Sequence, residues 1–252
     1  MIIAGTTMTA GSTGTSHKVP VARTRPVARI RPHLFLFLVF ALLPWRNALA
    51  QVSGSANYSV NSPIPDNDAS GLSSTVTFAS PQINAVQTMN VTLNITGGFN
   101  GDLYAYLTHG SGFAVLLNRV GKTGANGLGY ADGGFNVTLG DAASNGDIHS
   151  YQLTVNPGGA ALSGTWAPDA RNIDPAVSLD TSPRTAFLNS FNGIDPNGSW
   201  TLFVADVSAG GVSTLNSWGL QVIGVPEPSV PFLTTVGGLA LLLSARRSKR
   251  AI

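Results

Sequence analysis

The chain has 252 residues, no cysteine and few charges, with 14 Lys and Arg against 12 Asp and Glu. This length suits one or two domains. Without cysteine there is neither a disulfide nor a thiolate metal site. The composition also excludes a collagen, a coiled coil and a charge-rich disordered chain.

The basic residues gather at the two ends of the chain. Residues 1–50 hold six Lys or Arg and no acid, and four more lie among the last seven residues. The stretch 51–223 holds four Lys or Arg against eleven Asp and no Glu, a formal charge of −7. Nucleic-acid binding needs clustered Lys and Arg, so nucleic acid is not expected as a partner. An acidic body suits cations or neutral sugars better.

The first 50 residues have the layout of a signal peptide. Ten consecutive apolar residues span 34–43, basic residues precede them, and Ala48 and Ala50 supply the small residues of a cleavage site. This order is typical of export, and we expect signal peptidase to cut after Ala50, whether translation starts at Met1 or at Met8. Ten residues are too few to cross a bilayer. The alternative to a signal peptide is therefore a helix buried in the core of the protein.

The last 29 residues, 224–252, have the layout of a second targeting signal. Pro226, Glu227 and Pro228 precede an apolar helix expected over 229–245, and a basic cluster follows. Eighteen residues from Pro228 to Ala245 carry no charge, which as a helix is about 27 Å, near the lower limit for a membrane span. An ordinary tail anchor is the alternative.

This order of parts resembles the PEP-CTERM sorting signal of Gram-negative bacteria. The resemblance implies transient anchoring in the inner membrane through 229–245, followed by removal of the tail by an exosortase near Pro226–Pro228. It also implies export to the cell surface or to the exopolysaccharide matrix.

The sequence pattern between these two targeting signals, over residues 51–223, predicts an all-β domain. Short runs with period two are bounded by segments rich in Gly and Asn, which favour turns, and no stretch has a convincing helical period. The expected strands are at 74–78, 91–95, 103–107, 113–117, 135–139, 151–155, 200–205 and 218–223. We expect hairpin loops at 109–112 and at 208–211. Trp200 and Trp218 are expected in the core rather than in a sugar-stacking role.

Several blocks of the body resemble the P domain, or P/Homo B domain, of proprotein convertases. They begin at Ile64-Pro65-Asp66-Asn67 and continue with Gly101-Asp102-Leu103, Asn197–Leu202 and Leu215–Trp218. The similarity covers about residues 60–223, apart from a Gly-rich insertion at 120–147 and an unaligned stretch at 157–185. It implies a jelly-roll β-sandwich over 51–223, and a domain that normally accompanies a subtilisin-like serine endopeptidase. No protease domain is encoded in this sequence.

The sequence offers no catalytic constellation. His109 and His149 are the two histidines of the body, and neither is surrounded by a nucleophile elbow or a zinc-binding pattern. We therefore expect no catalytic residue, and interpret both histidines as loop or strand-end residues. The strongest rival is a glycosidase, because two aspartates that are distant in sequence can meet in the fold.

The aspartates are the better candidates for a cofactor. Calcium takes six to eight oxygen ligands, and the spacing of Asp66 and Asp68 could present two carboxylates to one ion. Turn capping explains the same residues without a metal. The function classes left open are an exported, non-catalytic protein that binds polysaccharide or another surface protein, and an accessory P domain that associates in trans with a subtilisin-like protease.

Overall fold

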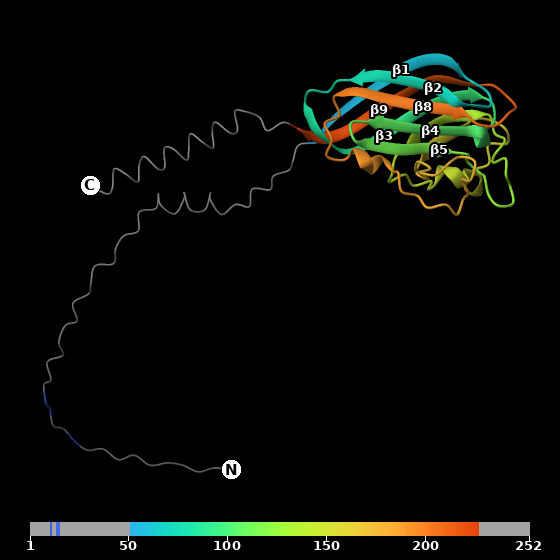
Figure 1. Cartoon of the computed structure of the whole chain (residues 1–252). Helices are drawn as coiled ribbons and strands as arrows, with labels where there is room; N and C mark the ends of the chain where they lie inside the picture. The colour runs from blue at the N-terminus through green and yellow to red at the C-terminus, as the bar shows by residue number, and fades with distance from the viewer. Residues whose placement is uncertain (1–10, 12–13, 16–50, 227–252) are drawn as a thin grey trace, which may run out of the picture. The chain divides into compact units, whose positions relative to one another are not determined.

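A computed structural model describes residues 11, 14–15 and 51–226 of the chain. The body is a sandwich of two β-sheets. The first sheet has the strand order β1 (Val52–Ile64), β9 (Ser213–Pro226), β3 (Ile83–Gly97), β6 (Gly134–Leu139) and β7 (Leu162–Trp166). The second has the order β2 (Asp68–Phe78), β8 (Gly198–Asp206), β4 (Leu103–His109) and β5 (Gly112–Asn118). Figure 1 shows the strands side by side, with the loops that follow β5 gathered along one side of them.

Alternation of apolar and polar residues explains why these segments form strands with one buried face. In β3, Val91, Leu93 and Ile95 are buried, while Thr92 and Asn94 between them are less so. Successive side chains of a strand point to opposite faces of its sheet. Each sheet therefore presents one apolar face to the other sheet and turns its second face outward.

The core lies between the two sheets. It contains three fully buried tryptophans, Trp166, Trp200 and Trp218, which come from β7, β8 and β9. Burying each large apolar side chain contributes roughly 1.5–3 kcal/mol. The expectation that Trp200 and Trp218 belong to the core is confirmed.

Turn chemistry fixes the β4–β5 hairpin. His109 pairs with Gly112, which leaves Gly110 and Ser111 as a two-residue turn. Gly110 has a φ of +55° and Ser111 has no positive φ, and a positive φ at the first turn position alone is the type II′ signature. The hairpin loop expected at 109–112 is confirmed, whereas the one expected at 208–211 is wrong. That loop connects β8 to β9, which lie in different sheets.

Within residues 51–226, three short 3-10 helices lie between the strands: η1 (Asn100–Asp102), η2 (Ile148–Leu153) and η3 (Leu188–Phe191). The strand expected at 151–155 is therefore wrong. Its alternating pattern resembles a strand, but the Asp147 carboxylate accepts from the His149 N–H, and this cap favours a helical start. The strand pattern expected at 218–223 continues further, as β9 runs to Pro226.

Some expectations fall outside the described residues. They are the signal peptide over 1–50 with Ala48 and Ala50, the motif residues Glu227 and Pro228, and the span over 229–245. Within the part of the chain that the structure describes, no helix is long and apolar enough to cross a membrane.

Candidate functional site

His109 ends β4 and stacks on a core tryptophan. Its ring lies parallel to that of Trp200, with centroids 4.1 Å apart and planes 5° apart. Nδ1 is 2.8 Å from the carbonyl oxygen of Ser199, and Nε2 is 2.7 Å from that of Asp195. Carbonyls only accept hydrogen bonds, so the ring makes both bonds only when it carries both protons. These contacts give His109 a structural role at the strand end.

His149 lies in a buried ionic network. Its Nδ1 is 2.8 Å from Asp169 Oδ2 and its Nε2 is 2.9 Å from the Lys122 carbonyl oxygen. Arg171 pairs with Asp169 at 3.1 Å and with Asp147 at 2.9 Å. Burial lowers the pKa of Arg171, but the two carboxylates more than offset this and the net direction is upward. The network joins the loops on either side of β6 and β7, and His149 and Asp169 have no exposed surface.

Asp66 and Asp68, the residues predicted to bind calcium, both cap backbone N–H groups, Asp68 within its own segment and Asp66 in the separate β8–β9 loop. Asp66 accepts from the Gly210 N–H, at 3.1 Å to Oδ1, and Asp68 Oδ1 accepts from the Ser70 N–H at 2.8 Å. Among the described residues, no group of three or more His, Cys, Asp or Glu is arranged to hold a metal ion. Calcium at Asp66 and Asp68 thus stays a prediction, and the capping contacts fit the alternative interpretation.

Asp102 and Asp206 meet at one end of the second sheet. Asp206 pairs in register with Leu103, the neighbour of Asp102, and the Val207 N–H donates to the Asp102 carbonyl at 2.9 Å. Burial raises the pKa of Asp206 to about 6, and the nearby charges of Asp102 and Asp66 add to this effect. Its Oδ1 accepts from the Ser208 N–H, while the buried Oδ2 has no hydrogen-bond partner.

A small hollow of about 180 Å³ opens beside Asp102. Its apolar wall includes Phe99, Leu128 and Tyr130, and Ser208 completes the polar side with Asp102. Burial raises the pKa of Asp102, and Arg119, 3.7 Å away, counters this rise. One carboxylate and aromatic walls are features of a ligand site.

The hollow does not provide a glycosidase pair. Two carboxyls must both reach the scissile bond in that chemistry. Asp102 lines the hollow, but Asp206 has no exposed surface and does not line it. The structure therefore brings together the two aspartates that the glycosidase alternative needs, yet leaves only one of them where a substrate could contact it.

Four aromatic rings form a continuous surface on the outer face of the second sheet. They belong to Tyr104 and Tyr106 of β4, Phe113 of β5 and Phe203 of β8, and we call them the aromatic cluster. Tyr106 stacks on Phe203 with centroids 4.8 Å apart, and it also contacts Phe113 at 5.3 Å. Tyr104 meets Phe203 edge-on at 6.4 Å. All four side chains are half-buried, so part of each ring remains accessible.

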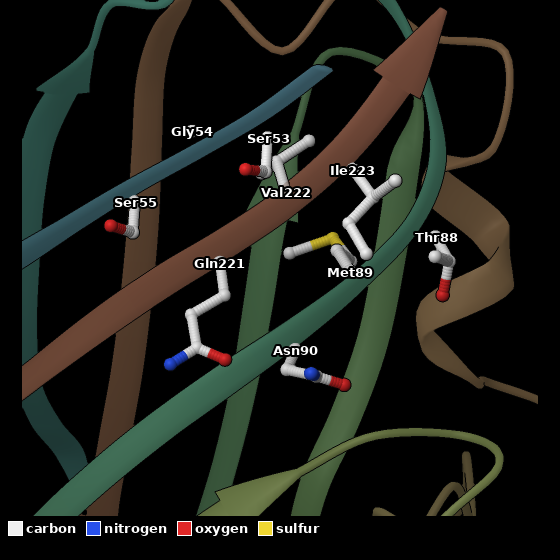
Figure 2. Close-up of a pocket in the computed structure, with 9 residues that line it drawn as sticks. All are labelled: Ser53, Gly54, Ser55, Thr88, Met89, Asn90, Gln221, Val222 and Ile223. Carbon is white, nitrogen blue, oxygen red and sulfur yellow. The ribbon is translucent and has the colours of Figure 1, made fainter. Parts of the chain in front are cut away.

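A second hollow, of about 290 Å³, lies on the first sheet. Figure 2 shows its lining, which comes from the three neighbouring strands β1, β9 and β3. Ser55, Gln221 and Asn90 provide one row of polar side chains across it.

Sequence reasoning missed the aromatic cluster and the hollow on the first sheet. The run Leu103–Leu107 signals a strand with apolar residues at every position, and only the sheet packing shows that Tyr104 and Tyr106 point outward. The signal for the polar face was present as Ser, Thr and Asn at alternate positions, for example over Val91–Ile95.

Comparisons with known proteins gave limited similarity. No protein-family model matches the chain, and no curated protein matches it significantly. Similar solved structures include the serine protease of Aeromonas sobria in complex with its chaperone, with 17% identity and a TM-score of 0.39, and the same protease alone, with 18% identity and a TM-score of 0.38. The matches cover 75% and 69% of this chain but only 29% and 27% of those chains. This level of similarity assigns neither a family nor an activity.

Proposed function

We propose that this is an exported, non-catalytic protein of the cell surface or exopolysaccharide matrix, whose β-sandwich binds polysaccharide or another surface protein. The strand orders β1-β9-β3-β6 and β2-β8-β4-β5, with consecutive strands β1 to β4 alternating between the sheets, support a jelly roll. Folds of this kind serve many functions, so the function must be argued from a site.

The aromatic cluster is the observation that carries the proposal. Aromatic side chains are enriched where proteins contact partners, because a ring offers a large rigid apolar face at low entropic cost. Tyr104 and Tyr106 add hydroxyl groups at the ring edges, and Thr75 and Thr201 extend the polar rim with hydroxyls 2.9 Å apart. A surface of accessible rings and hydroxyls suits contact with a sugar ring or with aromatic side chains of a protein partner.

The absence of catalysis is part of the proposal, and the buried charges support it. General acid–base catalysis needs titratable groups within reach of a substrate. His149 and Asp169 are fully buried, His109 is bonded to two carbonyls, and Asp206 lies behind the hollow that Asp102 lines.

Export and anchoring rest on the sequence signals at 1–50 and 224–252. Signal peptidase would release the body after Ala50, and an exosortase would remove the tail near Pro226–Pro228, which would leave the sandwich at the surface or in the matrix. Pro226 ends β9, so a cut after it would leave the strands of the sandwich intact.

The second candidate is an accessory P domain that associates in trans with a subtilisin-like serine endopeptidase. The aromatic cluster also favours this candidate, because rings are typical of protein interfaces. The two candidates differ in what the cluster binds.

A pull-down from the native matrix separates them. The full chain and the double variant Tyr106→Ser/Phe203→Ser are used as bait. Leu153→Ser/Val177→Ser is the matched control, because both residues are exposed apolar side chains that lie outside the cluster and outside both hollows. Polysaccharide retained by the wild type and by the control, but not by the cluster variant, would support the proposal. Retention of a subtilisin-like protease would support the accessory-domain candidate, and equal recovery with all three baits would contradict both.

A further inference from the structure

The first sheet carries no charged residue in any of its five strands. None of β1, β9, β3, β6 and β7 contains Asp, Glu, Lys, Arg or His. Soluble proteins normally place charges on such surfaces, and they protect edge strands with Lys in particular. The acidic residues of the body therefore lie elsewhere, although the outer face of this sheet is open to solvent.

Hydroxyl and amide side chains occupy that outer face in rows across the strands. In one row, Ser59 pairs with Ser217, Ser217 with Asn94, Asn94 with Asn136, and Asn136 with Ser163. Neighbouring strands lie about 4.7–4.9 Å apart, so these groups repeat at a regular spacing. We call this surface the uncharged face.

At the centre of the uncharged face, two polar side chains cover a glycine. Gly219 of β9 lies between Asn57 and Thr92 in register. A Cβ atom there would be 2.6 Å from Thr92 Oγ1 and 2.9 Å from Asn57 Oδ1. The two polar side chains thus close over the glycine, and no side chain protrudes between them.

The side-chain chemistry of the uncharged face favours some classes of ligand over others. An anionic polymer needs cations, and the five strands have none. A protein partner favours aromatic residues and Arg, and Ser is depleted at protein interfaces. A neutral polysaccharide presents hydroxyl groups that both donate and accept, as do the hydroxyls and amides of the face. Its lack of charge matches the lack of charge on these strands.

We propose that the uncharged face binds a neutral polysaccharide chain, with the hollow of about 290 Å³ between β1, β9 and β3 (Figure 2) as one sugar subsite. The proposal deepens the polysaccharide-binding function proposed above and rests on it. Ser55, Gln221 and Asn90 line the subsite, and Ile223 gives it an apolar margin. Each net hydrogen bond is weak, about 0.5–1.5 kcal/mol, so affinity comes from contacts in several rows.

The test compares two sets of surface variants of the full chain. Asn57→Ala/Asn136→Ala/Gln221→Ala removes three exposed amides from the uncharged face. Thr154→Ala/Asn172→Ala/Thr181→Ala is the control, because it removes three exposed polar side chains from loops outside both the uncharged face and the aromatic cluster. The probes are cellulose, a β-1,3-glucan and a mannan, with alginate as the anionic comparison, at low and at 1 M salt. Thermal melting of each variant checks that it is folded.

The expected result is binding to at least one neutral polysaccharide that salt does not weaken, with at least tenfold weaker binding for the amide variant and less than twofold change for the control. Unchanged binding by the folded amide variant would overturn the inference. If the Tyr106→Ser/Phe203→Ser variant loses polysaccharide while the amide variant keeps it, the proposed function stands and this inference falls. Binding to alginate alone, or self-association through this face, would also overturn it.

Discussion

The imidazole of His109 lies flat on the indole of Trp200, 4.1 Å from centroid to centroid. The stack connects the end of β4 to the core, and the carbonyls of Ser199 and Asp195 hold the ring in place. These contacts give the ring a structural role, although His109 is one of only two histidines in the body.

Replacing His109 tests this structural role. His109→Ala removes the ring's polar contacts with two carbonyls and one aromatic stack, so we expect the free energy of unfolding to fall by about 2–3 kcal/mol. His109→Phe keeps the stack and should lose about half as much. Urea denaturation of both variants measures the difference. Equal stability of His109→Ala and wild type would show that the stack contributes nothing.

Asp206 should make stability depend on pH. Its pKa is raised by burial to about 6, above the value of about 3.9 for an unfolded aspartate. The folded state therefore holds the proton more tightly, and the free energy of unfolding should fall by about 2–3 kcal/mol as the pH rises from 4 to 7. Asp206→Asn keeps the shape without the charge and should flatten this part of the profile. A variant profile parallel to that of the wild type would contradict the assignment.

Asp66 should stabilise the fold without a metal. Its carboxylate accepts from the Gly210 N–H and thereby ties the β1–β2 connection to the β8–β9 loop. We expect Asp66→Ala to lower the free energy of unfolding by about 1 kcal/mol, equally in EDTA and in millimolar calcium. A ligand that binds only the folded state raises its melting temperature. A wild-type melting temperature that rises with calcium, lost in Asp66→Ala, would instead establish the ion site predicted at Asp66 and Asp68.

Processing should remove both ends of the chain. The targeting signals at 1–50 and 224–252 predict a mature protein that begins at Gln51 and ends near Pro226–Pro228. Mass spectrometry of material released by the producing cell should give the mass of that fragment, plus any glycan. Extracellular protein that still carries Arg250 would contradict removal of the tail.

Local pattern was sufficient to predict an all-β domain but not its surface sites. The alternation over Val91–Ile95 and the Gly110 turn depend on neighbouring residues only, and both were predicted. The segment at 151–155 alternates in the same way, yet the Tyr151 hydroxyl donates to Asp132 at 2.7 Å, and that tertiary contact accompanies a 3-10 helix.

The sites depend on residues that meet only through the fold. Asp102 and Asp206 become neighbours because β4 pairs with β8. No local sequence pattern predicts which strands pair. The same holds for the aromatic cluster, since Phe203 reaches Tyr106 across two strands that are distant in sequence.

Binding without turnover is the central claim, and affinity electrophoresis tests it most directly. The purified full chain is run through gels that contain the polysaccharide of its own matrix, and the same mixture is assayed for newly released reducing ends. The account predicts retarded migration and no release of reducing ends. Release of reducing ends by the wild type that is lost in Asp102→Ala/Asp206→Ala would contradict it and would identify a glycosidase.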